Sequence, residues 1–171
     1  MNKSAIPSMP RFFDRYILLA EDAPVTEVLE KHQAFESAID ADTLKRLGDK
    51  RYAPGKWTVK DILQHIIDNE RVQSYRALRI ARNDQTSLPG YDENLFADHA
   101  QTERRTVDDL LEEFRLVRRS SILLFRSLPP EMLLREGTCN NITISPLALG
   151  FMLAGHQIHH VNVLKERYLA L

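Results

Sequence analysis

Three of the six histidines lie close together near the C-terminus, within the segment Leu153–Leu164. The apolar residues of this segment have the spacing of a helix, and His156 and His160 are four residues apart. Side chains with that separation lie one above the other on one helix face, so two neutral imidazole nitrogens can converge on one metal ion. Two ligands do not make a stable site, and the pair therefore predicts a third ligand elsewhere in the chain.

His65 is the third ligand that the sequence favours, because it lies close to the apolar stripe of a predicted helix that begins at Thr58. Helix bundles commonly hold metal ions between side chains of facing helices. Three neutral histidines leave at least one coordination position open to water or substrate, which distinguishes a catalytic site from a closed structural one. An ion held in this way can lower the pKa of a bound water to about 7 or stabilise a bound thiolate.

A simpler interpretation of these histidines stays open. A lone histidine on an apolar face is usually a hydrogen-bonded core residue, and this is the interpretation that we give to His32 and His99. It is equally available for the three candidate ligands. The segment is not a zincin motif, because Gln157 stands where the catalytic glutamate would be and an amide cannot act as a general base. His159 is either a hydrogen-bonding neighbour of the site or a competing ligand.

The candidate catalytic groups are two acids of the same predicted helix, Glu70 and Asp68, which would orient a ligand or accept a proton. Glu70 continues the apolar stripe, and a carboxylate there should be paired or functional because burying it alone is costly. Arg118, on the core face of a later helix, is its candidate partner; a structural ion pair and a role in orienting ligands or moving protons are both open. Asp61 and Asp68 are nearer to His65 in sequence and are alternative acceptors for its ring N–H.

Four amphipathic helices are predicted to position these residues, and no convincing hairpin pattern accompanies them. The fold class is therefore all-α, most simply a four-helix bundle. The connection of some twenty residues between the second and third helices, 83–105, is long enough to cross the bundle, so these two helices should run parallel. An arm with a short helix or turn precedes the first helix, in residues 1–24. The first predicted helix begins at residue 26 and ends either before residue 40 or soon after residue 47. The other three predicted helices are residues 58–82, 106–128 and 145–168.

The composition narrows the function classes. The chain has 171 residues, of which 43% are hydrophobic and 27% charged, and we expect one globular domain over residues 1–171. A net charge of -1 with interspersed signs disfavours nucleic-acid binding. No apolar run is long enough to span a membrane and no signal peptide is evident, so we expect a cytoplasmic protein. The single cysteine, Cys139, leaves histidine and carboxylate as the available metal ligands.

At these residues the chain resembles the DinB-like superfamily, which includes the YfiT-type proteins regarded as metal-dependent hydrolases. Four segments carry the resemblance, and they follow one another in the expected order over most of residues 25–168. Each segment alone is weak evidence, but the ordered set is specific. The segments are Trp57–Arg71, Leu88–Glu93, Glu113–Arg118 and Ala154–His160.

The resemblance implies an up-down-down-up four-helix bundle and a divalent ion, nickel or zinc, held by His65, His156 and His160. It also implies a homodimer and a small-molecule substrate. Some relatives are S-transferases that attach a low-molecular-weight thiol to an electrophile, while others have no known reaction. We therefore expect an enzyme, a thiol transferase or hydrolase, in which the loop Tyr91–Glu93 shapes the pocket. A metal-binding or stress-response module without turnover is the alternative.

Overall fold

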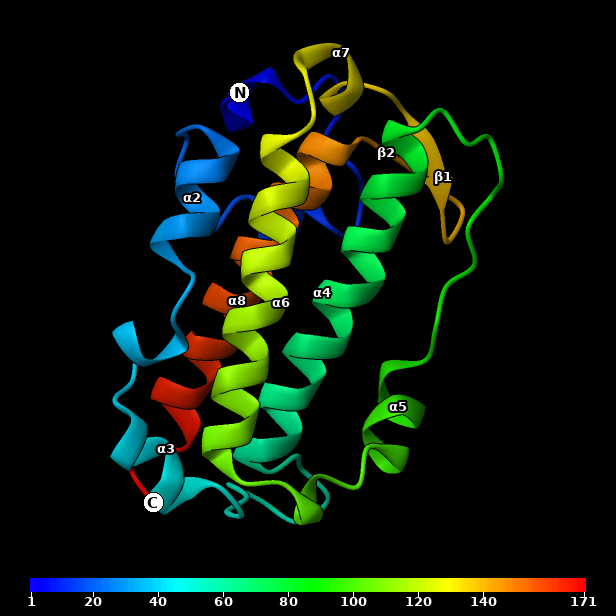
Figure 1. Ribbon diagram of the computed structural model, residues 1–171. Coiled ribbons are helices and arrows are strands. Elements are labelled where there is room, and N and C mark those ends of the chain that lie inside the picture. Colours follow the sequence, from blue (N-terminus) through cyan, green and yellow to red (C-terminus); the bar gives the residue numbers. More distant parts are fainter.

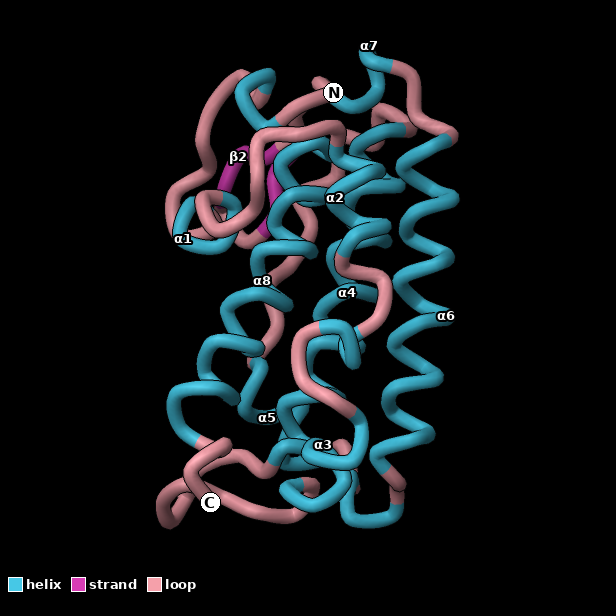
Figure 2. Tube along the Cα trace, turned by 90° about the vertical axis from the view of Figure 1, so that its left-hand side faces the viewer, coloured by secondary structure: helices cyan, strands magenta, loops and turns pink.

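Three long helices, α4, α6 and α8, form the centre of the molecule in the computed structural model, which describes residues 1–171 (Figure 1). Helix α4 packs against both α6 and α8, while the shorter α2 and α3 lie against α6 on the fourth side (Figures 1 and 2). The chain is mostly helical, as the sequence predicts. The helices are α1 (Asp14–Ile17), α2 (Val25–Lys31), α3 (Ala41–Leu47), α4 (Val59–Ala81), α5 (Glu93–His99), α6 (Val107–Arg126), α7 (Pro130–Leu133) and α8 (Pro146–Arg167), with 3-10 turns at Lys3–Ala5, Phe35–Ser37 and Thr102–Arg104.

The three long helices begin where the sequence predicts, because each start is capped by a side chain. The hydroxyl of Thr58 accepts a hydrogen bond from the backbone of Asp61, whose carboxylate accepts one in return from the backbone of Thr58. Thr106 and Asp109 form the same reciprocal box at the start of α6, and Ser145 caps α8. A cap of this kind stabilises a helix by about 1 kcal/mol. None of the helices is both long and apolar enough to cross a membrane.

The first predicted helix is wrong in its extent. Helix α2 stops at Lys31, and the chain continues through a 3-10 turn before α3 begins, so the predicted continuous helix is two short ones. At the break, the carbonyl oxygen of His32 accepts a hydrogen bond of 2.8 Å from the guanidinium of Arg118. The His32 carbonyl therefore bonds to another helix and not to a later residue of its own helix. Sequence periodicity indicates only which residues face inward, so it does not reveal this contact.

The structure contains a β-hairpin, which the sequence did not predict. Strands β1 (Gly137–Cys139) and β2 (Ile142–Ile144) pair antiparallel across a two-residue turn. Both turn residues, Asn140 and Asn141, have positive φ angles, 50° and 61°, which suit the tight turns of hairpins and which asparagine tolerates better than most residues. The connection 83–105 likewise contains a short helix, α5, that lacks a buried stripe.

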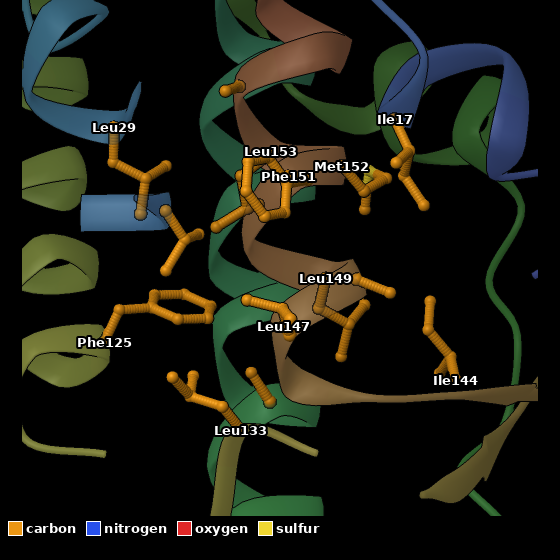
Figure 3. Close-up of a cluster of buried hydrophobic side chains, with 14 of the residues drawn as sticks. Ile17, Leu29, Phe125, Leu133, Ile144, Leu147, Leu149, Phe151, Met152 and Leu153 are labelled. Atoms are coloured by element: carbon orange, nitrogen blue, oxygen red, sulfur yellow. The ribbon is translucent and has the colours of Figure 1, made fainter. Parts of the chain in front are cut away.

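Two separate apolar cores fill the bundle. Core 1 surrounds the first half of α8, which is buried on every side by α1, α2, the hairpin and neighbouring helices, so this half of α8 lacks the predicted amphipathic pattern. Core 2 fills the opposite end. Core 1 includes Ile17, Leu29, Phe125, Leu133, Ile144, Leu147 and Phe151 (Figure 3); core 2 includes Phe35, Leu44, Leu63, Leu110, Phe114, Leu164 and Tyr168.

A layer of buried polar side chains separates the two cores along α4, α6 and α8; we call it the polar layer. Buried polar groups must find hydrogen-bonding partners, and those partners are side chains of the facing helices. The polar layer therefore fixes the three long helices relative to one another. Its members are Asn69, Glu70, Gln73 and Arg76 on α4, Arg118 and Ser121 on α6, and His156, Gln157 and His160 on α8.

Arg118 is the centre of one side of this layer. Its Nε and Nη2 donate to the two carboxylate oxygens of Glu70 at 2.8 and 2.9 Å, and its Nη1 donates to Gln157 at 2.9 Å as well as to the His32 carbonyl. Arg118 is fully buried and Glu70 nearly so. One guanidinium thereby joins α2, α4, α6 and α8, and the ion pair that the sequence suggests is confirmed.

Removing this guanidinium should be strongly destabilising. Arg118→Met is expected to lower the free energy of unfolding by about 3–5 kcal/mol, because it leaves the charge of Glu70 buried without compensation. Arg119→Met, a change to the next, exposed residue, is the matched control and should stay within about 0.5 kcal/mol of the unchanged protein. Urea unfolding followed by circular dichroism measures both. Equal effects of the two substitutions would contradict the structural role of Arg118.

Candidate metal centre

Three histidines converge at the edge of the polar layer. His65 lies in the second turn of α4, and His156 and His160 lie one turn apart on α8. Their Nε2 atoms face one another: that of His156 is 3.0 Å from that of His65 and 3.1 Å from that of His160. All three ligand atoms lie within 4.8 Å of one another and all three residues are buried. The structure thus brings together the three residues that the sequence singles out.

Burial keeps these imidazoles neutral near pH 7. Desolvation, with a smaller contribution from the charge of His159, lowers the pKa of His65 to about 4. Desolvation and the neighbouring histidines also hold the pKa values of His156 and His160 well below the usual 6.5. Neutral imidazole is the form that binds metal ions, so the cluster needs no deprotonation to act as a ligand set.

Hydrogen bonding alone does not account for this cluster. Each imidazole nitrogen carries either one hydrogen or one lone pair. The Nε2 of His156 therefore makes one good hydrogen bond, although it faces two other nitrogens at 3.0 and 3.1 Å. The Nδ1 of His160, the ring nitrogen that points away from the cluster, is also buried without a partner, and an ion at the Nε2 atoms would not change that. The interpretation of these residues as ordinary hydrogen-bonded core histidines is disfavoured by this arrangement.

The donor set fits a divalent ion. Histidine nitrogens bind zinc and similar ions at about 2.1 Å. Three neutral imidazole nitrogens that face one another within 4.8 Å would hold such an ion and supply it with three ligands. Imidazole also suits nickel, iron and copper, so the ligand set does not select one metal.

Two cavities reach the histidines from different sides. The cavity at His160 has a volume of about 260 Å³, and the cavity at His156 has a volume of about 90 Å³. A small molecule can therefore approach the cluster, which a purely structural site does not require. The first cavity is lined by residues including Tyr52, Lys56, Trp57, Asn94 and Tyr168; the second is lined by residues including Tyr16, Asn69, Gln73, Arg76, Tyr91 and Glu93.

Comparison with known proteins identifies the family. The sequence model described as the DinB superfamily matches residues 14–164. The chain belongs to the DinB superfamily. Among solved structures it is similar to YfiT from Bacillus subtilis, described as a probable metal-dependent hydrolase with an unusual four-helix bundle topology. The TM-score is 0.70 at 18% sequence identity, over 92% of this chain and 86% of YfiT, which supports the four-helix bundle fold. No curated protein matches the chain.

Aromatic rings surround the histidines of this DinB superfamily member. The ring of Trp57 lies 4.8 Å from that of His65, and the ring of Tyr16 lies edge-on to that of His156 at 5.1 Å. Tyr16 reaches this place because α1 packs directly on α8 at Gly155, where an added Cβ would lie 1.9 Å from the Tyr16 carbonyl oxygen. The glycine therefore sets how closely α1 approaches the site.

The two predicted catalytic carboxylates are engaged by other side chains. Both oxygens of Glu70 accept hydrogen bonds from Arg118, and Asp68 accepts one from Gln64 at 2.9 Å. Neither residue lines the two cavities at the histidines. Asp61 belongs to the capping box of α4 and also accepts a hydrogen bond from Thr102. A catalytic role for Glu70 or Asp68 stays a prediction.

The remaining histidines and Gln157 have separate places. His159 stands outside the ligand cluster and packs edge-on against the ring of Tyr16 at 5.3 Å. Gln157 accepts a hydrogen bond from Arg118, which ties the polar layer to the helix that carries two of the ligands. His32 is half-buried and so lies short of the core position expected for it, and the prediction for His99 is wrong because that residue is exposed on α5.

Several residues of the site were not predicted from the sequence. Tyr16 belongs to the N-terminal arm, and Asn69, Gln73 and Arg76 look like ordinary polar positions of a long helix. A polar residue at each of three positions spaced three or four apart, on the face that carries Glu70, is the pattern that could have revealed them. Of the predicted loop Tyr91–Glu93, the first and last residues line a cavity, while Asp92 caps α5.

The metal-free protein should lose stability as the pH falls from about 6.5 towards 4. The pKa of His65 is lower in the folded state than the usual 6.5 of the unfolded chain, so unfolding takes up a proton in this window. The stabilisation is complete above pH 6.5 and disappears as the pH falls towards the folded pKa. Each proton taken up on unfolding makes the free energy of unfolding fall by about 1.4 kcal/mol more per unit of decreasing pH.

His65→Gln should make the free energy of unfolding less dependent on pH between about 6.5 and 4, because about one proton fewer is taken up on unfolding. Urea unfolding at a series of pH values in the presence of a chelator measures the steepness. His99→Gln, a change to an exposed histidine, is the matched control and should leave it unchanged. An unaltered pH dependence for His65→Gln would contradict the buried, neutral state of this residue.

Proposed function

We propose that this protein is a metal-dependent enzyme in which a divalent ion, zinc or nickel, bound by His65, His156 and His160, activates a small thiol or water for attack on a small electrophilic substrate. The observation that carries the proposal is the convergence of three buried, neutral Nε2 atoms beside two cavities. Membership of the DinB superfamily and the similarity to YfiT are consistent with it.

The chemistry that such an ion supplies is Lewis-acid activation, in which the pKa of a bound water or thiol falls towards neutrality. The protein contributes the ligands and the shape of the site. The rings of Trp57, Tyr16 and Tyr91 line the approaches to the histidines and give them partly apolar walls. Glu93 is an exposed carboxylate that lines the cavity at His156, and we assign it the role of accepting a proton from the entering nucleophile.

The finer parts of the proposal rest on the family resemblance. A thiol is preferred to water as the nucleophile on that ground alone, and so is the homodimer. The up-down-down-up order is supported by the course of the chain in Figure 1, where α4 and α6 run in one direction and α8 runs in the other. A metal-binding module without turnover is the competing function, and the two cavities favour the enzyme over it.

Metal-dependent conjugation of thiols tests the proposal. The zinc- or nickel-loaded protein is expected to accelerate the reaction of at least one of several low-molecular-weight thiols with monochlorobimane, and His160→Ala is expected to lose both about one ion per chain and this activity. Metal content by mass spectrometry and conjugation by fluorescence are measured on the same samples. Circular dichroism verifies that the variant is folded.

His159→Ala is the matched control, because it removes a neighbouring imidazole of the same helix that lies outside the ligand cluster. It should keep its metal. Unchanged metal content in folded His160→Ala would overturn both the enzyme and the metal-binding module. A second outcome is that His160→Ala loses its metal, while the unchanged protein neither conjugates any of the thiols nor hydrolyses common esters and amides. This outcome would favour the metal-binding module.

A further inference from the structure

Arg76 is a buried cation without an acidic partner. It lies on α4 in the polar layer, with 4% of its surface exposed. Its Nη1 donates to the side-chain oxygen of Gln73 at 3.1 Å and its Nη2 donates to the carbonyl oxygen of Pro89 at 2.5 Å. Both acceptors are neutral, and no carboxylate lies within 4.0 Å of the guanidinium. A buried charge of this kind is costly unless something compensates it.

The other buried arginine of the polar layer, Arg118, shows how this protein compensates a buried positive charge. Arg118 has a carboxylate held by two parallel hydrogen bonds and two further acceptors. Arg76, with five N–H groups available, has two neutral acceptors. Arg118 is therefore paired with a carboxylate within the folded chain. Arg76 retains N–H groups, and its charge meets no anion but only the face of the Tyr91 ring, whose centre is 6.0 Å from its Cζ.

Arg76 lines the cavity that reaches His156. The volume of this cavity, about 90 Å³, corresponds to the space of about three water molecules, which is enough for a carboxylate and a short carbon chain. The guanidinium and the candidate metal ligand thus share one small cavity, so a molecule bound at one can reach the other.

Asn69 provides a second unsatisfied group on the same cavity. It is 93% buried, and while its side-chain nitrogen donates to the Tyr91 hydroxyl at 2.8 Å, its side-chain oxygen is buried without a partner. Rotation of the amide by half a turn exchanges the two ends, since the Tyr91 hydroxyl can donate as well as accept. The free end of this amide can therefore offer an acceptor or a donor to a ligand.

We propose that Arg76, assisted by Asn69, binds a carboxylate of the substrate and makes this enzyme selective for small carboxylate-bearing reactants. The inference rests on the proposed function, because it assigns the substrate class of the same site. A carboxylate matches the forked donors of a guanidinium in two parallel hydrogen bonds, as Glu70 matches Arg118 in this protein. Glu93 is an exposed residue that lines the same cavity, so the proposal places the ligand's carboxylate at the buried guanidinium of Arg76 and away from this second acid.

The carboxylate can belong to the thiol or to the electrophile. Two pairs of compounds, each a carboxylate and its neutral amide, distinguish these sources. For the thiol, Co²⁺-loaded protein is titrated with 3-mercaptopropionate and with its neutral amide, and the visible spectrum of the ion reports binding. For the electrophile, the rate of alkylation of 2-mercaptoethanol by iodoacetate is compared with that by iodoacetamide. In this reaction the sulfur–carbon bond forms, the carbon–iodine bond breaks, iodide leaves and the thiol proton passes to solvent.

The unchanged protein is expected to favour the carboxylate over the amide by roughly ten- to hundred-fold in at least one pair, after correction for the uncatalysed rates, as a charge-assisted hydrogen-bonded pair requires. Arg76→Gln should abolish that preference, because the affinity or rate for the carboxylate falls by roughly ten- to hundred-fold more than that for the amide. Arg71→Gln is the matched control: it removes the same charge from the same helix at a position outside both cavities, and should keep the preference.

Loss of the preference in Arg76→Gln with retained Co²⁺ and amide binding supports the proposal. No preference in the unchanged protein, or a preference that persists in Arg76→Gln, overturns it. If Arg76→Gln does not fold, Arg76→Lys, which keeps the charge without the fork, should weaken the preference, and an unchanged preference in it overturns the proposal. Failure of Co²⁺ to bind would contradict the proposed function and not this inference. In that case, calorimetric titration of the metal-free protein and of metal-free Arg76→Gln with propionate tests the carboxylate site by itself.

Discussion

The need to satisfy a buried layer of polar side chains is the constraint on which the rest of this structure depends. Arg118 meets that need on one side by joining Glu70, Gln157 and the His32 carbonyl. These bonds set the register of α4 against α8, because they connect one residue of each helix through a shared guanidinium. The two helices carry the three histidines, so the same bonds bring their Nε2 atoms to within a few ångströms of one another.

The other side of the polar layer is left incomplete. Of the three buried polar atoms without partners, two belong to it, His160 Nδ1 and Asn69 Oδ1, and Arg76 lies there without a carboxylate. Such groups cost stability, and proteins retain them where a ligand completes them. Here they surround cavities that reach the histidines. The closed side of the layer therefore supports the fold, and the open side is where we place binding and chemistry.

The sequence predicts what local chemistry determines. The capping residues Thr58, Thr106 and Ser145 mark the helix starts, and the four-residue spacing of His156 and His160 fixes a shared helix face. The sequence fails where tertiary contacts decide the local structure. The break after α2 depends on a guanidinium that is distant in sequence, and the burial of α8 on all sides depends on covering elements that periodicity does not describe. The turn at Asn140 and Asn141 did carry a hairpin signal, but its strands are only three residues long.

Locating the ion directly tests the central claim most sharply. Crystals of the protein loaded with zinc or nickel should give an anomalous difference peak at the absorption edge of that metal. The peak should lie about 2.1 Å from the Nε2 atoms of His65, His156 and His160, with its remaining coordination directed towards the cavities. A peak elsewhere, or none at this cluster in fully metal-loaded protein, would contradict the account.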